Sequence, residues 1–313
     1  MSLANLAHLH LLLNHLPTVG FSVGLGLYLV ALFRKSDDLK RASLVIFLGI
    51  ALLTIPTFMT GKAAQQAIAG QEGVSDVLTE THEDAALLAF FFMAITGVLA
   101  WLGLWQYRRM SRVTGGILTA VLLLSFVTFG LMARAANIGG EIRHPEIKAA
   151  GEAAAPNTEL IKSGSIAGFI NTTNWAWPTL ETLHFIGLTM LLGVVLVVNL
   201  RMLGVAKNVS FAAVHRLLPW GILGFGINVI TGIFFFITVP EQYTQNIALI
   251  WKMLLTVIAG LNVIYFTLFD EAWVLGPGDD APVRAKDMAS FTILLWVGVI
   301  WFGRMMPFIG GSF

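Results

Sequence analysis

Eight apolar runs, each long enough to cross a bilayer as a helix, dominate this sequence. A helix rises about 1.5 Å per residue, so about 20 apolar residues cross the roughly 30 Å of hydrocarbon in a bilayer. The runs therefore predict an all-α, polytopic membrane protein with eight transmembrane helices. The predicted spans cover roughly residues 11–33, 42–60, 85–106, 114–133, 177–200, 216–238, 247–268 and 288–306.

The composition supports a bilayer environment. Of the 313 residues, 57% are hydrophobic and 12% are charged, whereas about a quarter of the residues in a soluble domain are charged. The net charge is +1 and the basic residues are scattered, so no basic face is available for phosphates. We expect lipid, and not nucleic acid, to surround this chain.

The chain contains no cysteine. This absence excludes c-type haem attachment, thiolate-bound iron–sulfur clusters, disulfides and thiol nucleophiles. The seven histidines then supply nearly all of the capacity to ligate haem iron or a soft metal.

Basic residues gather in alternate linkers between the predicted spans. The basic linkers are 34–41, 107–113, 201–215 and 269–287. By the positive-inside rule these linkers are cytoplasmic, which places both termini outside. We expect a multi-pass protein of a bacterial inner (cytoplasmic) membrane, with outer connections at 61–84, 134–176 and 239–246.

The longest connection separates two groups of four spans and predicts two membrane domains. We expect a first four-helix bundle over 1–135, a periplasmic linker over 136–176 and a second four-helix bundle over 177–313. Polar residues at the outer ends of the spans recur at offsets of 169, 170 and 170 residues. The pairs are His15 with His184, His82 with Lys252, and Arg134 with Arg304. This recurrence predicts two duplicated bundles.

His184 is an ionisable residue inside a predicted membrane span. It lies within an apolar run about 10 Å below Trp177. An ionisable group at the centre of a membrane helix costs about 2.5–3.5 kcal/mol and usually faces a partner in the bundle interior. In a four-helix bundle the first and third helices are diagonal. His15 and His82, or His184 and Lys252, are then able to face each other across a flat macrocycle.

These residues predict one or two haem b groups. Neutral imidazole is a good iron ligand, so His15, His82 and His184 are the predicted metal ligands. Lys252 is a further axial ligand, a propionate partner or an interfacial anchor beside Trp251. Arg134 and Arg304 are expected to pair with haem propionates, or else to extend to the membrane interface. Each histidine has the alternative of a hydrogen bond to a neighbouring helix.

A second metal hypothesis uses the outer side of the membrane. His8 and His10 lie close to His15 in the sequence, and His144 lies in an outer connection. Imidazole binds copper and zinc as well as iron, so this group of histidines is a candidate copper site. His215, at the cytoplasmic end of the sixth span, is expected to be interfacial, or to serve a quinone or proton pathway.

The second half of the chain resembles a group of four-helix membrane proteins. The segments that carry the resemblance are WPTLETLHFIG, HRLLPWGILGFGINVITG, IWKMLLTVIAGLN and WFGRMMP. They are similar to the haem-binding protoporphyrinogen oxidase J type and the copper-resistance D type. The resemblance implies haem b at His184 and Lys252, which match a first-helix histidine and a third-helix lysine of the former type. The third helix departs from that type because no histidine follows Tyr265.

The first half resembles small bacterial membrane proteins with histidines on the first and third helices. NHLPTVG and THEDAALLAF carry this likeness, which implies a cofactor without specifying a reaction.

We therefore expect a membrane b-type cytochrome that passes electrons between the quinone pool and a periplasmic or complex-bound redox partner. The alternatives are a copper-handling membrane protein and a cofactor-free anchoring subunit of a larger complex. Whether the chain is an enzyme stays open, because any reaction would rest on bound haem as part of an oxidoreductase.

Overall fold

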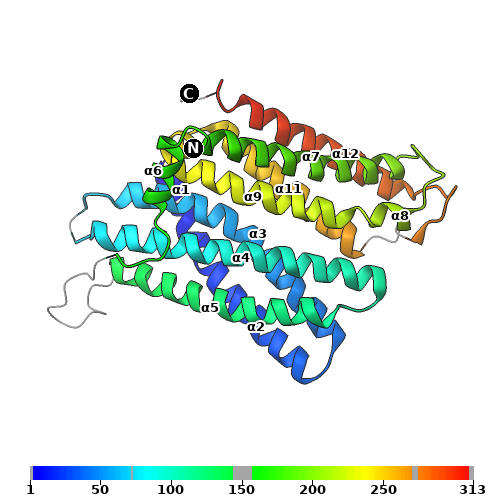
Figure 1. Cartoon of the computed structure of the whole chain (residues 1–313), viewed down its shortest axis with the longest axis horizontal. Helices are drawn as coiled ribbons and strands as arrows, with labels where there is room; N and C mark the ends of the chain where they lie inside the picture. The colour runs from blue at the N-terminus through cyan, green and yellow to red at the C-terminus, as the bar shows by residue number, and fades with distance from the viewer. Residues whose placement is uncertain (1–2, 72, 144–156, 270–273, 310–313) are drawn as a thin grey trace. The chain divides into compact units, whose positions relative to one another are not determined.

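Helices form all of the regular secondary structure in the part of the chain that the computed structural model describes, residues 3–71, 73–143, 157–269 and 274–309 (Figure 1). This result confirms the predicted all-α class. The helices are α1 (Leu3–Leu13), α2 (His15–Phe33), α3 (Asp37–Ile68), α4 (Asp76–Met110), α5 (Gly115–Arg143), α6 (Ser163–Thr172), α7 (Ala176–Met202), α8 (Phe211–His215), α9 (Leu218–Thr238), α10 (Pro240–Thr244), α11 (Ile247–Phe269) and α12 (Val283–Met305).

Eight helical segments of the described residues are long and apolar enough to cross a membrane, as the sequence predicted. They are Asn5–Phe33, Asp37–Ile68, Asp76–Met110, Gly115–Ile142, Ala176–Met202, Phe211–Thr238, Ile247–Tyr265 and Val283–Met305. Their length and composition are those of a multi-pass membrane protein.

Three helices run beyond the apolar spans predicted for them. α3 continues to Ile68, α4 already begins at Asp76 and α5 continues to Arg143, although the predicted spans stop at 60, 85 and 133. The extra turns are rich in Ala, Gln and Glu, which favour helix without being apolar. The predicted connection 61–84 is therefore largely helical, and 134–176 contains the end of α5 together with α6.

The chain divides into two compact units, which we describe separately. Unit 1 comprises Met1–Ala100, Gly115–Pro178 and Ile233–Gln245, and unit 2 comprises Trp101–Thr114, Thr179–Gly232 and Asn246–Phe313. α4 and α9 contribute residues to both units. The predicted duplication and the predicted domain limits stay predictions.

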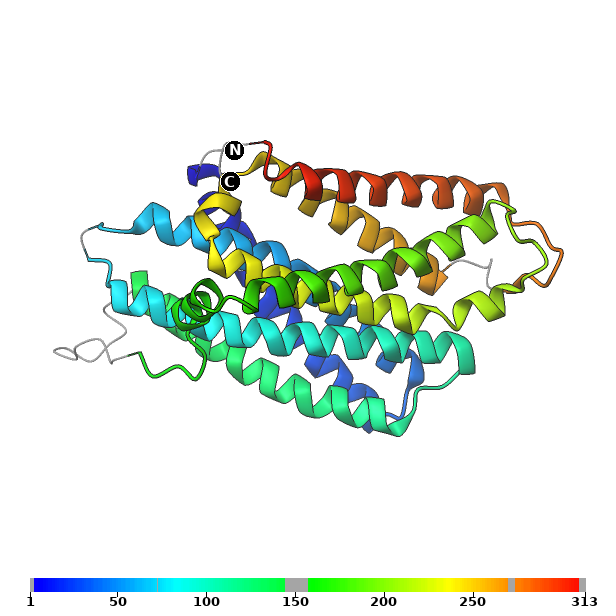
Figure 2. The ribbon, with the colours of Figure 1, turned by 45° about the horizontal axis from the view of Figure 1, so that its top comes forward.

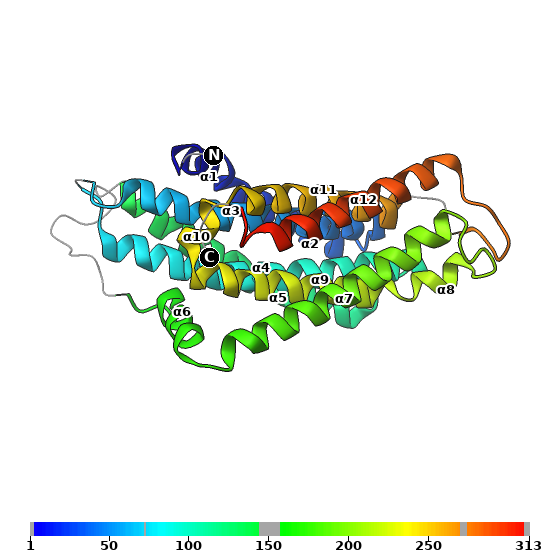
Figure 3. The ribbon, with the colours of Figure 1, turned by 90° about the horizontal axis from the view of Figure 1, so that it is seen from above.

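In unit 1, α1 and α2 form one nearly continuous span that packs against α3 (Figure 3). The amide of Asn14 still bonds to the carbonyl of His10, but Pro17 has no N–H to continue the pattern. α2 begins at His15, two residues before Pro17. Packing is close because the glycines are small: a Cβ on Gly24 would lie 3.1 Å from the Phe47 ring.

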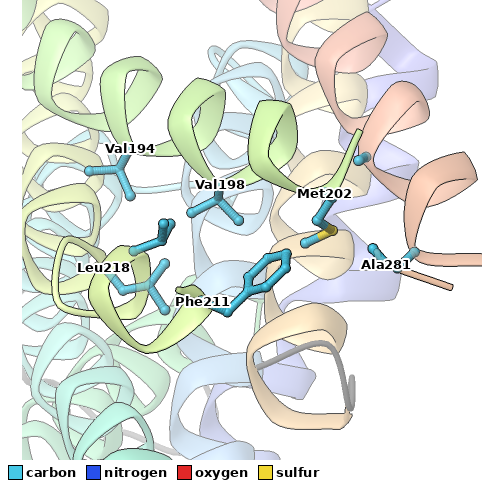
Figure 4. Close-up of a cluster of buried hydrophobic side chains, with 9 residues drawn as sticks. Val194, Val198, Met202, Phe211, Leu218 and Ala281 are labelled. Carbon is cyan, nitrogen blue, oxygen red and sulfur yellow. The ribbon is translucent and has the colours of Figure 1, made fainter. Parts of the chain in front are cut away.

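The unit 2 core lies where α7 meets α8 and the beginning of α9 (Figure 4). Val194, Val198 and Met202 of α7 point toward Phe211 and Leu218. α11 and α12 run side by side and pack closely together (Figure 2). α7 and α9 approach so closely at Gly224 that an added Cβ would lie 2.6 Å from a backbone oxygen of Gly187.

Each unit also contains a buried charge that is held by hydrogen bonds. In unit 1, the carboxylate of Asp84 accepts bonds from the Asn157 amide group and the Ser163 backbone N–H, both at 2.7 Å. In unit 2, the guanidinium of Arg201 is 2% exposed and donates to backbone carbonyls of Val209, Gly276 and Asp279. These bonds offset the cost of removing a charge from water.

Candidate functional site

His82 is fixed on α4 by a contact with the neighbouring helix α5. Its Nδ1 donates a hydrogen bond to the carbonyl of Ala135 at 2.9 Å. A helix carbonyl is usually covered by the side chain four residues later, because side chains lean toward the helix N-terminus. Here that residue is Gly139, and a Cβ on it would lie 2.8 Å from Cε1 of His82. The glycine therefore leaves the Ala135 carbonyl open to the imidazole.

His10 makes the same kind of contact from α1 to α3. Its Nδ1 lies 3.0 Å from the carbonyl oxygen of Thr57, and the residue four positions later is again a glycine. A Cβ on Gly61 would lie 3.3 Å from Cε1 of His10. The Thr60 hydroxyl oxygen lies 3.4 Å from the same Nδ1. Two imidazoles of unit 1 thus each lie over a glycine and bond to a backbone oxygen.

These contacts define the tautomer of both side chains. A carbonyl oxygen only accepts, so Nδ1 carries the proton in His10 and in His82. In the neutral ring, Nε2 then carries the lone pair, and it is this nitrogen that is able to ligate a metal. Unit 1 therefore contains two imidazoles in which Nε2 is the nitrogen able to act as a ligand.

His184 on α7 is fixed by a side chain rather than by the backbone. Its Nδ1 lies 2.7 Å from the hydroxyl oxygen of Thr231 on α9. That hydroxyl donates its own proton to the Ile227 carbonyl at 2.7 Å, so it accepts from Nδ1. The result is the same tautomer as in unit 1, with the lone pair on Nε2.

Lys252 on α11 belongs to the same unit as His184. Its Nζ would lie 3.7 Å from a Cβ placed on Gly303 of α12. Unit 2 therefore contains both His184 and Lys252, and their predicted pairing stays a prediction. The residues named in these contacts come from four helices, α7, α9, α11 and α12.

The other predicted site residues are exposed or have contacts of their own. His15 is exposed to the surroundings of the chain. Arg134 donates from Nε and Nη2 to the carboxylate of Glu159, at 2.8 and 2.5 Å. Arg304 is exposed and lies over the Phe308 ring, 5.5 Å from its centre. The two arginines thus have a carboxylate and an aromatic ring as their contacts.

The predicted outer copper group is only partly described. His8 is exposed, His10 makes the contact with α3, and His144 lies outside the described residues. Within residues 3–71, 73–143, 157–269 and 274–309, three or more His, Cys, Asp or Glu side chains nowhere gather as a metal site would require. His215 is buried and stacked on Trp105, with ring centres 6.0 Å apart and an interplanar angle of 14°.

A polar pocket of about 390 Å³ opens in unit 1 beside the extended ends of α3 and α4. Lys62 and Glu83 line it and form an ion pair at 2.8 Å. Each of these residues is adjacent in sequence to a residue of the histidine contacts, Gly61 or His82. The pocket is open and charged, whereas the imidazoles lie against helix backbone.

Sequence reasoning paired His184 with His15, but the structure gives His10 the corresponding contact. His10 and Thr57 are 47 residues apart, and so are His184 and Thr231. Both residues of the second pair therefore follow those of the first by the same 174 positions. A histidine and a threonine 47 positions apart, repeated in the two halves, form the sequence signal that indicates the His10 contact.

The described residues are thus those of an all-helical protein with the helices of a multi-pass membrane protein. Three of its imidazoles are fixed by hydrogen bonds to neighbouring helices. No protein-family model, curated protein or solved structure matches it.

Proposed function

We propose that this protein is a b-type cytochrome of a bacterial inner membrane, which passes electrons between the quinone pool and a periplasmic or complex-bound redox partner. One observation carries the proposal. On a long apolar helix, His184 is fixed through Nδ1 by the Thr231 hydroxyl so that Nε2 holds its lone pair, and Lys252 lies on α11 of the same unit. An ionisable pair of this kind inside a membrane helix bundle usually has a function.

The donor set of unit 2 fits haem b. Imidazole Nε2 is a common axial ligand of haem iron, and a histidine ligand usually donates its other N–H to a neighbouring oxygen. The Thr231 hydroxyl takes this supporting position for His184. The Lys252 amine would either ligate the iron or donate a charge-assisted hydrogen bond to a haem propionate.

The residues of the chain position and insulate the cofactor in this proposal. When bound, haem b supplies the one-electron chemistry. His184 holds its ring in one orientation through Thr231. Lys252 contributes a positive charge to the neighbourhood, which favours a bound group that carries negative propionates. The apolar helices around these side chains exclude water, which strengthens both interactions.

The orientation in the membrane belongs to the same proposal. The basic linkers lie in the cytoplasm, both termini lie outside, and the two halves derive from one duplicated four-helix bundle. The repeated His–Thr separation of 47 residues supports the duplication. The haem groups then lie nearer the periplasmic side, in reach of a periplasmic partner.

The proposal is tested with membranes that contain the full chain. We expect added quinol to produce a reduced b-type haem spectrum, and His184→Ala to remove at least half of that signal at equal protein level. His15→Ala is the matched control, because His15 is an exposed histidine, and it should leave the spectrum unchanged. Absence of haem from the purified wild-type protein, or full haem content in the His184 variant, would overturn the proposal.

A further inference from the structure

We propose that unit 2 binds an anionic phospholipid at the end of α4, through Arg109, Arg112 and Arg216. These three residues, the arginine patch, come from the last turn of α4, from the turn after it and from the residue that follows α8. The inference goes beyond the proposed function and does not depend on it, because it uses only the helices, charges and exposed side chains at this end of the unit.

Two hydrogen bonds and a ring stack hold the end of α4 against α8. Nε1 of Trp105 donates to the backbone oxygen of His215 at 3.0 Å, and the rings of the same two residues are stacked. Nη1 of Arg109 donates to the backbone oxygen of Ala212 at 3.3 Å. All four residues belong to unit 2. The two segments therefore lie side by side within one compact unit.

These contacts bring the arginines of the patch close to one another. Arg216 follows Ala212 by four residues and has helical backbone angles, φ −66° and ψ −17°. The two residues are therefore about one helical turn, 5.4 Å, apart. Because Arg109 already contacts the Ala212 carbonyl, little more than one turn separates it from Arg216. Arg112 follows Arg109 by three residues, which limits the distance between their Cα atoms to about 11 Å.

No carboxylate compensates the arginine patch. The sequence has no Asp or Glu in residues 85–140 or 182–240, which include both segments. Among the residues that the structure describes, none of the three arginines forms an ion pair. Lys207, in the loop before α8, differs from them because it pairs with Asp280 at 3.3 Å. Since neighbouring positive charges repel one another, the patch favours a bound anion.

Exposed apolar side chains beside the patch favour a lipid over a free anion. Met110, Leu217 and Trp220 are exposed, and each lies within four residues of an arginine of the patch. Arginine binds phosphate oxygens through parallel hydrogen bonds, and tryptophan is typical of the membrane interface. A phospholipid satisfies both groups of side chains, with its phosphate at the arginines and an acyl chain against the apolar residues.

Native mass spectrometry of the purified full-length protein tests this site, with phosphatidylglycerol as the anionic lipid and phosphatidylcholine as the neutral one. We expect phosphatidylglycerol to bind the wild type at least tenfold more tightly. One arginine near an anionic lipid contributes about a fivefold factor in affinity. Arg112→Gln and Arg216→Gln should each weaken phosphatidylglycerol binding by about that factor, and the double variant by about 25-fold. Both side chains are exposed, so we expect the variants to fold.

Lys207→Gln is the matched control, because Lys207 already has an ion pair in the same unit. It should leave the affinity for phosphatidylglycerol unchanged. Equal affinity of the wild type for the two lipids would overturn the proposal. So would full binding in the double variant, or an equal loss in Lys207→Gln. Sodium phosphate should not displace the lipid more than sodium chloride of the same ionic strength does. Displacement by phosphate alone would indicate a site for free anions and would overturn the lipid assignment.

Discussion

The two units hold their histidines in different ways. In unit 1, His10 and His82 donate to backbone carbonyls that glycines leave open, whereas His184 in unit 2 donates to the Thr231 hydroxyl. A carbonyl acceptor is part of the fold, so only a change in helix packing removes it. A hydroxyl acceptor is a single side chain and is removed by one substitution.

The difference shows that the same tautomer is reached with two kinds of support. In unit 1 the carbonyl acceptors are accessible because glycine has no side chain to cover them. In unit 2 the side chain of Thr231 is itself the acceptor. The buried charges differ as well, since unit 1 buries the carboxylate of Asp84 and unit 2 buries the guanidinium of Arg201. The following substitutions test each side of this comparison.

The largest expected effect is that of Arg201→Met in unit 2. The substitution leaves three backbone carbonyls without the guanidinium that bonds to them. An unsatisfied buried acceptor costs about 1–3 kcal/mol, so we expect a loss of about 3 kcal/mol in the free energy of unfolding. Unfolding by dodecyl sulfate in mixed micelles measures it. A stability equal to that of the wild type would show that water replaces the guanidinium.

The next effect is that of Gly139→Ala in unit 1. The new methyl group would lie 2.8 Å from Cε1 of His82, so the imidazole must leave the Ala135 carbonyl. Overpacking of this kind costs about 1–3 kcal/mol. Gly140→Ala is the matched control, since nothing lies within 4 Å of its Cβ position. Equal stability of the two variants in the same detergent assay would contradict the role of Gly139.

A smaller effect is expected for Thr231→Val, which keeps the shape of the side chain and removes the acceptor of His184. A hydrogen bond of this kind contributes about 1 kcal/mol. The tautomer of His184 should also become mixed, which nitrogen-15 chemical shifts of the imidazole report. His10 and His82 serve as internal references, because their carbonyl acceptors are unchanged. A single Nδ1–H tautomer of His184 in the variant would show that Thr231 does not set it.

The smallest effect concerns Asp280, which lies outside the membrane spans. Hydrogen bonds from Lys286 and Lys207 hold the pKa of its exposed carboxyl below the ordinary value. A lowered pKa adds stability above the ordinary pKa, and this stability is lost as the pH falls through the lowered value. Because the ion pairs are exposed, Asp280→Asn should change the unfolding midpoint at pH 7 very little, and not at all at pH 2. A large shift at pH 7 would show that these exposed ion pairs contribute more to stability than their exposure allows.

The sequence predicted the helices well, because a membrane helix needs an apolar run long enough to cross the hydrocarbon core and hydropathy shows where such runs lie. It missed the outer parts of α3, α4 and α5, where polar helix formers continue the helix beyond the apolar run. These turns carry Gly61, His82 and Gly139, so the region around the unit 1 histidines was the least predictable. The unit 2 helices end near the predicted limits, and the pairing of His184 with Lys252 stays a prediction.

The contact of His10 with α3 was not predictable for a similar reason. The depth of a residue along its span favours His15, the histidine nearer the apolar run. Helix packing determines which side of a helix faces its neighbour. For His10, a glycine on the neighbouring helix makes room for the ring. Gly61 lies 51 residues from His10 in the sequence, so no local pattern around His10 indicates the contact.

The most direct test of the account is the haem b content of the purified wild-type protein, measured as pyridine haemochrome per chain. The account predicts at least one haem b group per chain. A protein that contains no haem b would contradict it, and the fixed imidazoles would then be hydrogen-bonded ties between helices.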